Sequence, residues 1–177
     1  MKNTIISRLF GHATPSAKDT QLKLRDGLKV LIVDDSRTHL YSLEKILKAE
    51  GVKTYTAENG KQGILMARHI KPDLILMDIV MPEINGFQAT RYLSRQEDTA
   101  AIPIIIISGS EQESDKAWGI KLGAKDYMQK PVQKNLLLEK ISKWTAEVNG
   151  LKKSAPVSRP DPAEQKVEQS QSWVEAG

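Results

Sequence analysis

Cysteine is absent from this chain of 177 residues, which excludes disulfide bonds and thiolate metal sites. Because this absence is typical of a reducing compartment, we expect a cytoplasmic protein. No apolar run approaches the roughly 18 residues that a membrane-spanning helix needs. Residues 1–10 also lack the long apolar core and the cleavage motif of a signal peptide. We therefore expect neither export nor insertion into a membrane.

Other absences narrow the class of function. The chain has no Gly-x-x-x-x-Gly-Lys-Ser/Thr phosphate loop, which excludes the P-loop nucleotide hydrolases. Its formal net charge is +4, but the basic residues are too scattered to indicate a nucleic-acid or membrane partner. His12, His39 and His69 lack the spacing of metal ligands, so we expect them on the surface or in packing contacts.

The residues that are present divide the chain into three parts. Residues 1–28 are polar and unpatterned, and we expect them to form a flexible N-terminal extension. Residues 29–149 alternate short apolar runs with amphipathic stretches, which predicts a single domain. Residues 150–177 contain three prolines among polar and charged residues, which predicts a disordered tail and no DNA-binding output domain.

The middle part repeats one pattern five times, a short apolar run followed by apolar residues at helical spacing. Expected strands cover residues 30–33, 53–57, 74–77, 104–107 and 127–128. Expected helices cover residues 38–49, 87–93, 116–122 and 136–148, with one more from residue 64 to before Pro72. Runs that are apolar on both faces indicate parallel strands between two helix layers. The pattern predicts an α/β fold with a doubly wound parallel sheet.

Charged and polar residues follow the ends of four expected strands. They are Asp34 and Asp35, then Asp78, Ser108 and Lys130. A lone aspartate at a strand end is most often a turn former or a helix cap. Right-handed crossovers, however, bring the C-terminal ends of all strands to one edge, where such sheets bind ligands. Because three carboxylates at one place would repel each other, the set predicts a hard divalent cation such as Mg²⁺, with Lys130 offsetting the remaining charge.

Four segments carry a resemblance to a known family. They are Val33-Asp34-Asp35-Ser36, residues 77–82 with Asn85-Gly86, Ile107-Ser108-Gly109, and residues 127–131. Together they resemble the signature of two-component response-regulator receiver domains, which are CheY-like. The resemblance covers about residues 29–149 and implies a flavodoxin-like (βα)5 sheet with strand order 2-1-3-4-5. Residues 77–82, 85–91 and 115–119 are more closely similar to CheY-like regulators of type IV pilus twitching motility.

The resemblance implies roles for the acidic residues. Asp78 would be the phosphoacceptor and one of the metal ligands. Asp35 would ligate Mg²⁺ directly, and Asp34 would do so through water. The Val80 carbonyl would supply another metal oxygen.

The resemblance also implies how phosphorylation is stabilised and transmitted. Ser108 and the Gly109 N–H would bond phosphoryl oxygens, and Lys130 would pair with the phosphoryl group. Tyr127 would change rotamer as Ser108 moves. The bond between Lys130 and Pro131 would be cis, the form that only X-Pro bonds adopt readily.

The family likeness implies a function as well. The chain would be a single-domain, monomeric response regulator that accepts a phosphoryl group from a CheA-like histidine kinase and turns over no external substrate. Phosphorylation would switch a protein-interaction surface in pilus or chemotaxis-like signalling, with the downstream protein target left open. Trp118 could belong to that surface or could equally be a packing residue. The alternative is a phosphorylation-independent interaction module on the same scaffold, which would have no need for the acid, serine and lysine set.

Overall fold

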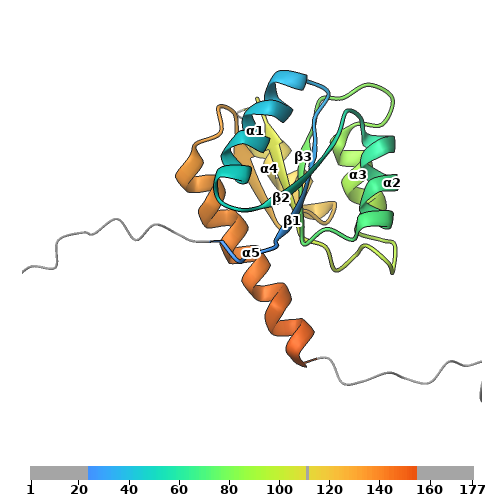
Figure 1. Ribbon diagram of the computed structural model, residues 1–177. Helices are drawn as coiled ribbons and strands as arrows, with labels where there is room; N and C mark the ends of the chain where they lie inside the picture. The colour runs from blue at the N-terminus through green and yellow to red at the C-terminus, as the bar shows by residue number, and fades with distance from the viewer. Residues whose placement is uncertain (1–23, 111, 155–177) are drawn as a thin grey trace, which may run out of the picture.

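Five parallel strands form one sheet in the computed structural model, which describes residues 24–110 and 112–154, with side chains up to residue 146. The strands are β1 (Lys29–Val33), β2 (Lys53–Ala57), β3 (Leu74–Asp78), β4 (Ile104–Ser108) and β5 (Asp126–Gln129). The helices are α1 (Arg37–Ala49), α2 (Gly60–Ile70), α3 (Gly86–Leu93), α4 (Glu113–Lys121) and α5 (Lys134–Ser154). The strand order is β2-β1-β3-β4-β5, which confirms the predicted fold (Figure 1).

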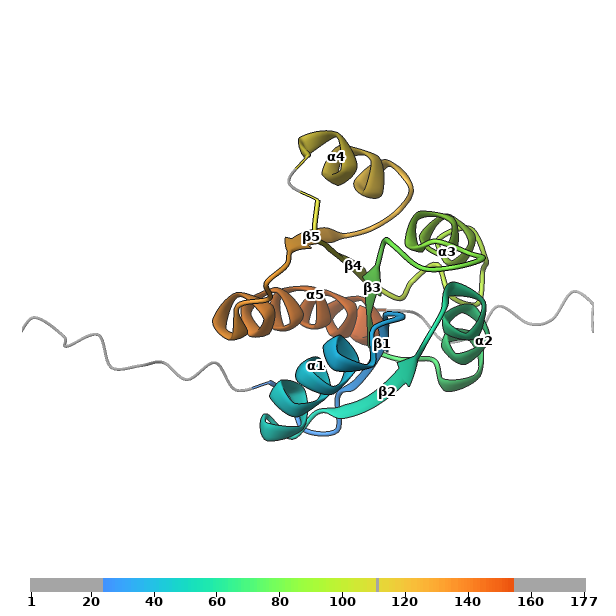
Figure 2. The ribbon, with the colours of Figure 1, turned by 90° about the horizontal axis from the view of Figure 1, so that it is seen from above.

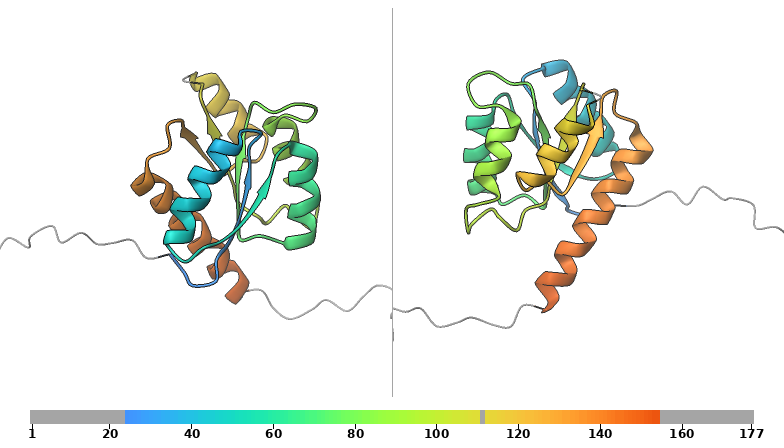
Figure 3. Two further views of the ribbon diagram at one scale, coloured as in Figure 1. Left: turned by 45° about the horizontal axis from the view of Figure 1, so that its top comes forward. Right: turned by 180° about the vertical axis from the view of Figure 1, so that it is seen from behind.

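Helices cover both faces of the sheet. Helices α1 and α5 lie on one face, and α2 and α3 lie on the other, as the view from above shows (Figure 2). Helix α4 lies beside β5 at one edge of the sheet, which the view from behind shows (Figure 3). Because every strand runs in the same direction, all five C-terminal ends meet at the same edge.

Alternate residues of β1 and β3 pack into two separate cores. Even positions of β1 and β3, such as Ile32 and Leu76, pack with α1 and α5. Odd positions, such as Leu31 and Met77, pack with α2 and α3. This period of two is the geometry of an extended strand whose side chains point to opposite faces. The continuous apolar runs in the sequence follow from it, because both faces of these strands are buried.

Side-chain caps decide where two helices begin. Asn59 accepts a hydrogen bond from the Gln62 N–H at 2.8 Å, so α2 begins at Gly60 rather than at the predicted residue 64. Asn85 and Gln88 form a reciprocal capping box that starts α3. The sequence pattern of Asn59-Gly60 favours a turn equally well, which explains the difference.

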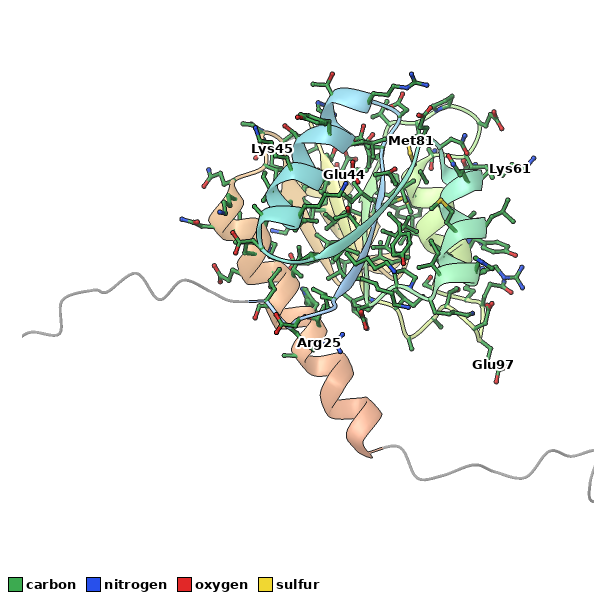
Figure 4. The ribbon with its side chains drawn as sticks, viewed as in Figure 1. Arg25, Glu44, Lys45, Lys61, Met81 and Glu97 are labelled. Carbon is green, nitrogen blue, oxygen red and sulfur yellow. The ribbon has the colours of Figure 1, made fainter. Side chains whose placement is uncertain are left out.

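The packed unit also extends beyond the expected boundaries at residues 29 and 149. Leu24 and Leu28 are buried in the core, and Arg25 forms an ion pair with Asp73 at 3.0 Å. Figure 4 shows Arg25 at the end of the domain opposite to Met81. Helix α5 continues to Ser154 and extends past the sheet (Figure 1). Most of the expected flexible extensions, residues 1–23 and 155–177, lie outside the described residues.

Membrane crossing was not expected from the sequence. Within residues 24–110 and 112–154, no helix combines the length and the apolar character that a membrane span needs.

Candidate functional site

Three carboxylates converge at the C-terminal edge of the sheet. Val33 of β1 pairs with Met77 of β3, so the residues that follow them, Asp34 and Asp78, meet across the two strands. Asp34, Asp35 and Asp78 each place a carboxylate oxygen within 4.8 Å of the others. Asp34 and Asp78 are buried and Asp35 is exposed. Oxygen donors at this spacing are the ligands that a hard divalent cation prefers.

Lys130 joins two of these carboxylates. Its Nζ lies 2.7 Å from Asp78 Oδ1 and 2.9 Å from Asp34 Oδ2. The backbone N–H of Lys130 donates to the Ser108 carbonyl at 2.7 Å, which fixes the end of β5 against the end of β4. The peptide bond between Lys130 and Pro131 is cis. One cation is therefore held at the centre of the acidic cluster.

The charges of the cluster shift the acidity of its members. Burial raises the pKa of the Asp78 carboxyl, and the neighbouring Asp34 and Asp35 raise it further, which outweighs the lowering by Lys130. Burial alone would lower the pKa of Lys130, but its hydrogen bonds to Asp78 and Asp34 outweigh burial and raise it. Lys130 is therefore held as a cation. Its charge alone does not compensate for the burial of the Asp78 carboxylate and for the two neighbouring carboxylates.

The buried Asp34 uses both of its carboxylate oxygens in contacts within the protein. Asp34 Oδ1 accepts from the Ser36 N–H at 2.8 Å, and its Oδ2 accepts from Lys130. Both oxygens of Asp34 thus have donors within the protein. Asp35 is the exposed member of the set. The oxygens of Asp34, Asp35 and Asp78 together fit a hard divalent cation.

Ser108 lies at the end of β4, next to the strand that carries Asp78. Its side chain is buried, and Ser108 Oγ accepts from the Ser110 N–H at 3.0 Å. The Tyr127 hydroxyl donates to the carbonyl of the same Ser110 at 2.9 Å. A side chain added at Gly109 would meet no atom within 4 Å. The loop after β4 therefore links Ser108 to Tyr127 through Ser110, a link that the sequence pattern did not indicate.

Val80 lies in the loop between β3 and α3, and its side chain is exposed. Gly86 closes this loop, because its N–H donates to the Ile79 carbonyl at 3.0 Å. A side chain at Gly86 would collide with the Asp78 carbonyl, so only glycine permits this approach. The loop that carries Val80 is thereby held against Asp78.

His39 is the second residue that sequence reasoning missed, since we expected it only on the surface or in packing contacts. Its Nδ1 lies 3.2 Å from Asp34 Oδ2 and 3.1 Å from Lys130 Nζ. His39 also lines a cavity of about 220 Å³ between α1 and the segment after β5, with Ser42, Leu43, Ile46, Ile107, Lys130, Pro131 and Val132. Its position three residues after the helix cap Ser36 was the only available signal, because the first turn of α1 lies over the strand end.

Comparison with known proteins shows similarity to one protein family. Residues 30–142 match the model of the response regulator receiver domain. Protein PilH of Pseudomonas aeruginosa is 51% identical over 114 residues, which are 64% of this chain and 94% of that protein.

Solved structures agree with this match. The chemotaxis protein CheY4 of Vibrio cholerae has a TM-score of 0.63 and 26% identity over 66% of this chain and 98% of its own. The receiver domain of a sensor histidine kinase from Pseudomonas aeruginosa has a TM-score of 0.64 and 28% identity. That match covers 68% of this chain and 98% of the other, whose structure has a magnesium ion coordinated in the active-site cleft. An acidic triad such as Asp34, Asp35 and Asp78 is typical of the Mg²⁺ site in these domains.

Proposed function

This chain belongs to the response regulator receiver family, and we propose that it accepts a phosphoryl group from a histidine kinase on Asp78. Membership places the chain in two-component signalling and makes it a response regulator rather than an enzyme that turns over a substrate. The proposal adds the acceptor residue, the donor and the response. The observation that carries it is the position of Lys130, which bridges Asp78 and Asp34 with contacts of 2.7 and 2.9 Å.

The transfer follows from the contacts of Asp78. A carboxylate oxygen of Asp78 attacks the phosphorus of a phosphohistidine, and the electron pair of the broken P–N bond returns to the imidazole. The transferred group carries its charge on peripheral oxygens, so positioning and nearby cations supply most of the catalysis. Lys130 pairs with one of these oxygens. Mg²⁺, held by Asp35, Asp78 and the Val80 carbonyl with Asp34 behind them, would neutralise further negative charge.

The response begins at Ser108. In the unphosphorylated protein its hydroxyl accepts from the Ser110 N–H. A phosphoryl group on Asp78 offers an acceptor for the hydroxyl hydrogen of Ser108, so Ser108 turns its hydroxyl towards the phosphoryl group, and the Gly109 N–H supplies a second bond. Ser110 then loses the hydrogen bond from its N–H to Ser108 and keeps only the one that its carbonyl accepts from the Tyr127 hydroxyl. The loop becomes freer to move, and Tyr127 can change rotamer with it. Phosphorylation thereby biases two pre-existing states of the loop after β4.

The cellular setting is proposed from the relatives. We assign the chain to type IV pilus twitching or chemotaxis-like signalling, with a CheA-like kinase as donor, because PilH is 51% identical. The working unit is a cytoplasmic, monomeric receiver domain over about residues 29–149, lengthened at its start by Leu24 and Leu28. The output is a protein-interaction surface beside α4, where Trp118 is half-exposed.

Mass spectrometry of the intact protein with acetyl phosphate and Mg²⁺ tests the proposal. The wild type should gain one phosphoryl group that hydroxylamine removes, and Asp78→Asn should gain none. Asp98→Asn is the matched control. Asp98 also pairs with two cations, Arg68 and Lys71, but it is exposed and lies between α3 and β4 rather than in the acidic cluster. Labelling of Asp78→Asn at the wild-type level would refute the acceptor assignment. A wild type that stays unlabelled would favour the phosphorylation-independent interaction module.

A further inference from the structure

His39 lies against the acidic cluster, although nothing in the proposed chemistry requires it. We propose that His39 is a positioning residue for Lys130, which accepts a hydrogen bond through Nδ1 and holds the ammonium group against Asp78. The inference rests on the proposed function, because its effect is on transfer to Asp78. His39 itself contacts neither Asp78 nor any phosphoryl oxygen in this account.

The three hydrogens of the ammonium group decide how the contacts are made. A lysine ammonium has three donors and no acceptor. Lys130 Nζ has three acceptors in range: Asp78 Oδ1 at 2.7 Å, Asp34 Oδ2 at 2.9 Å and His39 Nδ1 at 3.1 Å. Because an ammonium cannot accept, the proposed hydrogen bond requires that Nδ1 of His39 is the unprotonated ring nitrogen. The 3.2 Å between Nδ1 and Asp34 Oδ2 is then the separation of two acceptors that share one ammonium.

The backbone holds His39 in this position. Ser36 caps α1, and its Oγ accepts from the His39 N–H at 3.4 Å. The next residue, Leu40, is buried and donates from its N–H to the Ser36 carbonyl at 3.0 Å. The side chain of His39 is 48% exposed, so its place depends on this helix start and on Lys130.

The consequence concerns the freedom of a long side chain. A lysine side chain has about four rotatable bonds and loses much rotamer freedom when its ammonium group is held in one position. Asp78 and Asp34 hold Lys130 from the side of the sheet, and His39 holds it from the side of the cavity that both residues line. Without His39, water takes the third hydrogen bond, and the ammonium group samples positions farther from Asp78. Transfer to Asp78 then becomes slower.

The rate of labelling by acetyl phosphate with saturating Mg²⁺ tests this role at one mildly alkaline pH. We compare the wild type with His39→Ala, with His39→Asn, whose side-chain oxygen can replace Nδ1, and with His69→Ala as a control on the exposed end of α2. Replacement of this hydrogen bond by one to water should slow His39→Ala about fivefold. His39→Asn and His69→Ala should stay within about twofold of the wild type. Mg²⁺ affinity should be equal in all four proteins.

The measured rates and Mg²⁺ affinities decide whether His39 positions Lys130. A wild-type rate in His39→Ala overturns the inference, and so does an Asn variant as slow as the Ala variant, because the hydrogen-bond acceptor would then be irrelevant. A parallel loss of Mg²⁺ affinity would mean that His39 acts on the acids instead.

Nuclear magnetic resonance gives a readout that does not need phosphorylation. The ¹⁵N shift of His39 Nδ1 should be that of a hydrogen-bonded acceptor and should move towards the free imidazole value in Lys130→Met. No change in that variant contradicts the contact. A wild type that is not labelled at all would instead refute the proposed function and leave this spectroscopic test standing.

Discussion

Helix α1 buries three leucines against the sheet, whereas helix α4 buries only Gly119. Both helices follow a strand that ends in the site, α1 after Asp34 and α4 after Ser108. On α4, Trp118 and Ile120 leave 49% and 46% of their surface exposed. Segments with little buried apolar surface open and shift most easily. The difference indicates that the side of the site with the acidic cluster is rigid, whereas the α4 side is the one that can shift.

The cores under the two helices differ in the same way. The core beneath α1 and α5 takes residues from four strands and both helices, and from the segment that precedes β1. The core beside α4 is built on Ile79, Ile106 and Ala124, with Phe87 and Tyr127 partly buried against it. Tyr127 thus belongs to the smaller core, and its hydroxyl makes a single hydrogen bond to the Ser110 carbonyl. A small change at Ser108 therefore meets little resistance on this side.

The largest expected effect comes from the start of the chain, which supports the rigid side. A protein that begins at residue 24 should unfold within about 1 kcal/mol of full length, the scale of a surface change. A protein that begins at residue 29 loses the buried Leu24 and Leu28 and should be at least about 4 kcal/mol less stable, since each buried leucine contributes about 2–5 kcal/mol. Urea denaturation measures both. Equal stability of the two truncated proteins would mean that the segment does not support this core.

A pair of substitutions compares the two helices directly. Leu43→Ala on α1 removes a side chain that is 5% exposed and should lower the free energy of unfolding by about 3 kcal/mol. Ile120→Ala on α4 removes one that is 46% exposed and should lower it by less than about 1 kcal/mol. Thermal or urea denaturation of both proteins measures the contrast. Similar losses at the two sites would remove the basis for treating α4 as the mobile side.

A smaller effect, of opposite sign, is expected at Asp78. Burial and the neighbouring carboxylates raise the pKa of Asp78 in the folded protein, so the native state binds a proton more tightly than the unfolded chain. Stability should therefore fall as pH rises from the ordinary carboxyl pKa through the raised one. Asp78→Asn has no such charge and should be more stable than the wild type at neutral pH without Mg²⁺.

Denaturation curves at several pH values test this sign. The advantage of Asp78→Asn should shrink as the pH falls from above the raised pKa of Asp78 towards the ordinary carboxyl pKa. Below about 4, where the wild-type carboxyl is protonated in both states, the advantage should be lost. Saturating Mg²⁺ should also reduce it, because a cation offsets the charge. A variant that is less stable than the wild type at neutral pH would show that the ion pair with Lys130 outweighs burial.

Much of the site could be predicted from sequence because the chemistry lies at strand ends. Right-handed crossovers bring the C-terminal ends of parallel strands to one edge, so the presence of Asp34 and Asp78 at the same edge follows from the alternation of strands and helices. The strand order itself came from the family resemblance, since periodicity cannot distinguish among parallel orders. The structure agrees with that order.

The contacts that were missed depend on side-chain direction and on local caps. His39 reaches Lys130 across 91 residues of sequence, and no spacing pattern encodes such a contact. Leu24 and Leu28 lie in a short polar stretch that has no periodicity of its own, yet both fill gaps in the core. The start of α2 at Gly60 depends on whether Asn59 caps a helix or forms a turn, which its sequence context leaves open.

The measurement that tests the account most directly is a map of backbone amide shifts before and after phosphorylation. The wild type with acetyl phosphate and Mg²⁺ should show its largest changes between Ser108 and Gln129, with little change along α1 beyond its first turn. Asp78→Asn under the same conditions should show only the changes that Mg²⁺ causes. Equal changes along α1 and α4, or a phosphorylated protein whose α4 side does not shift, would contradict the account.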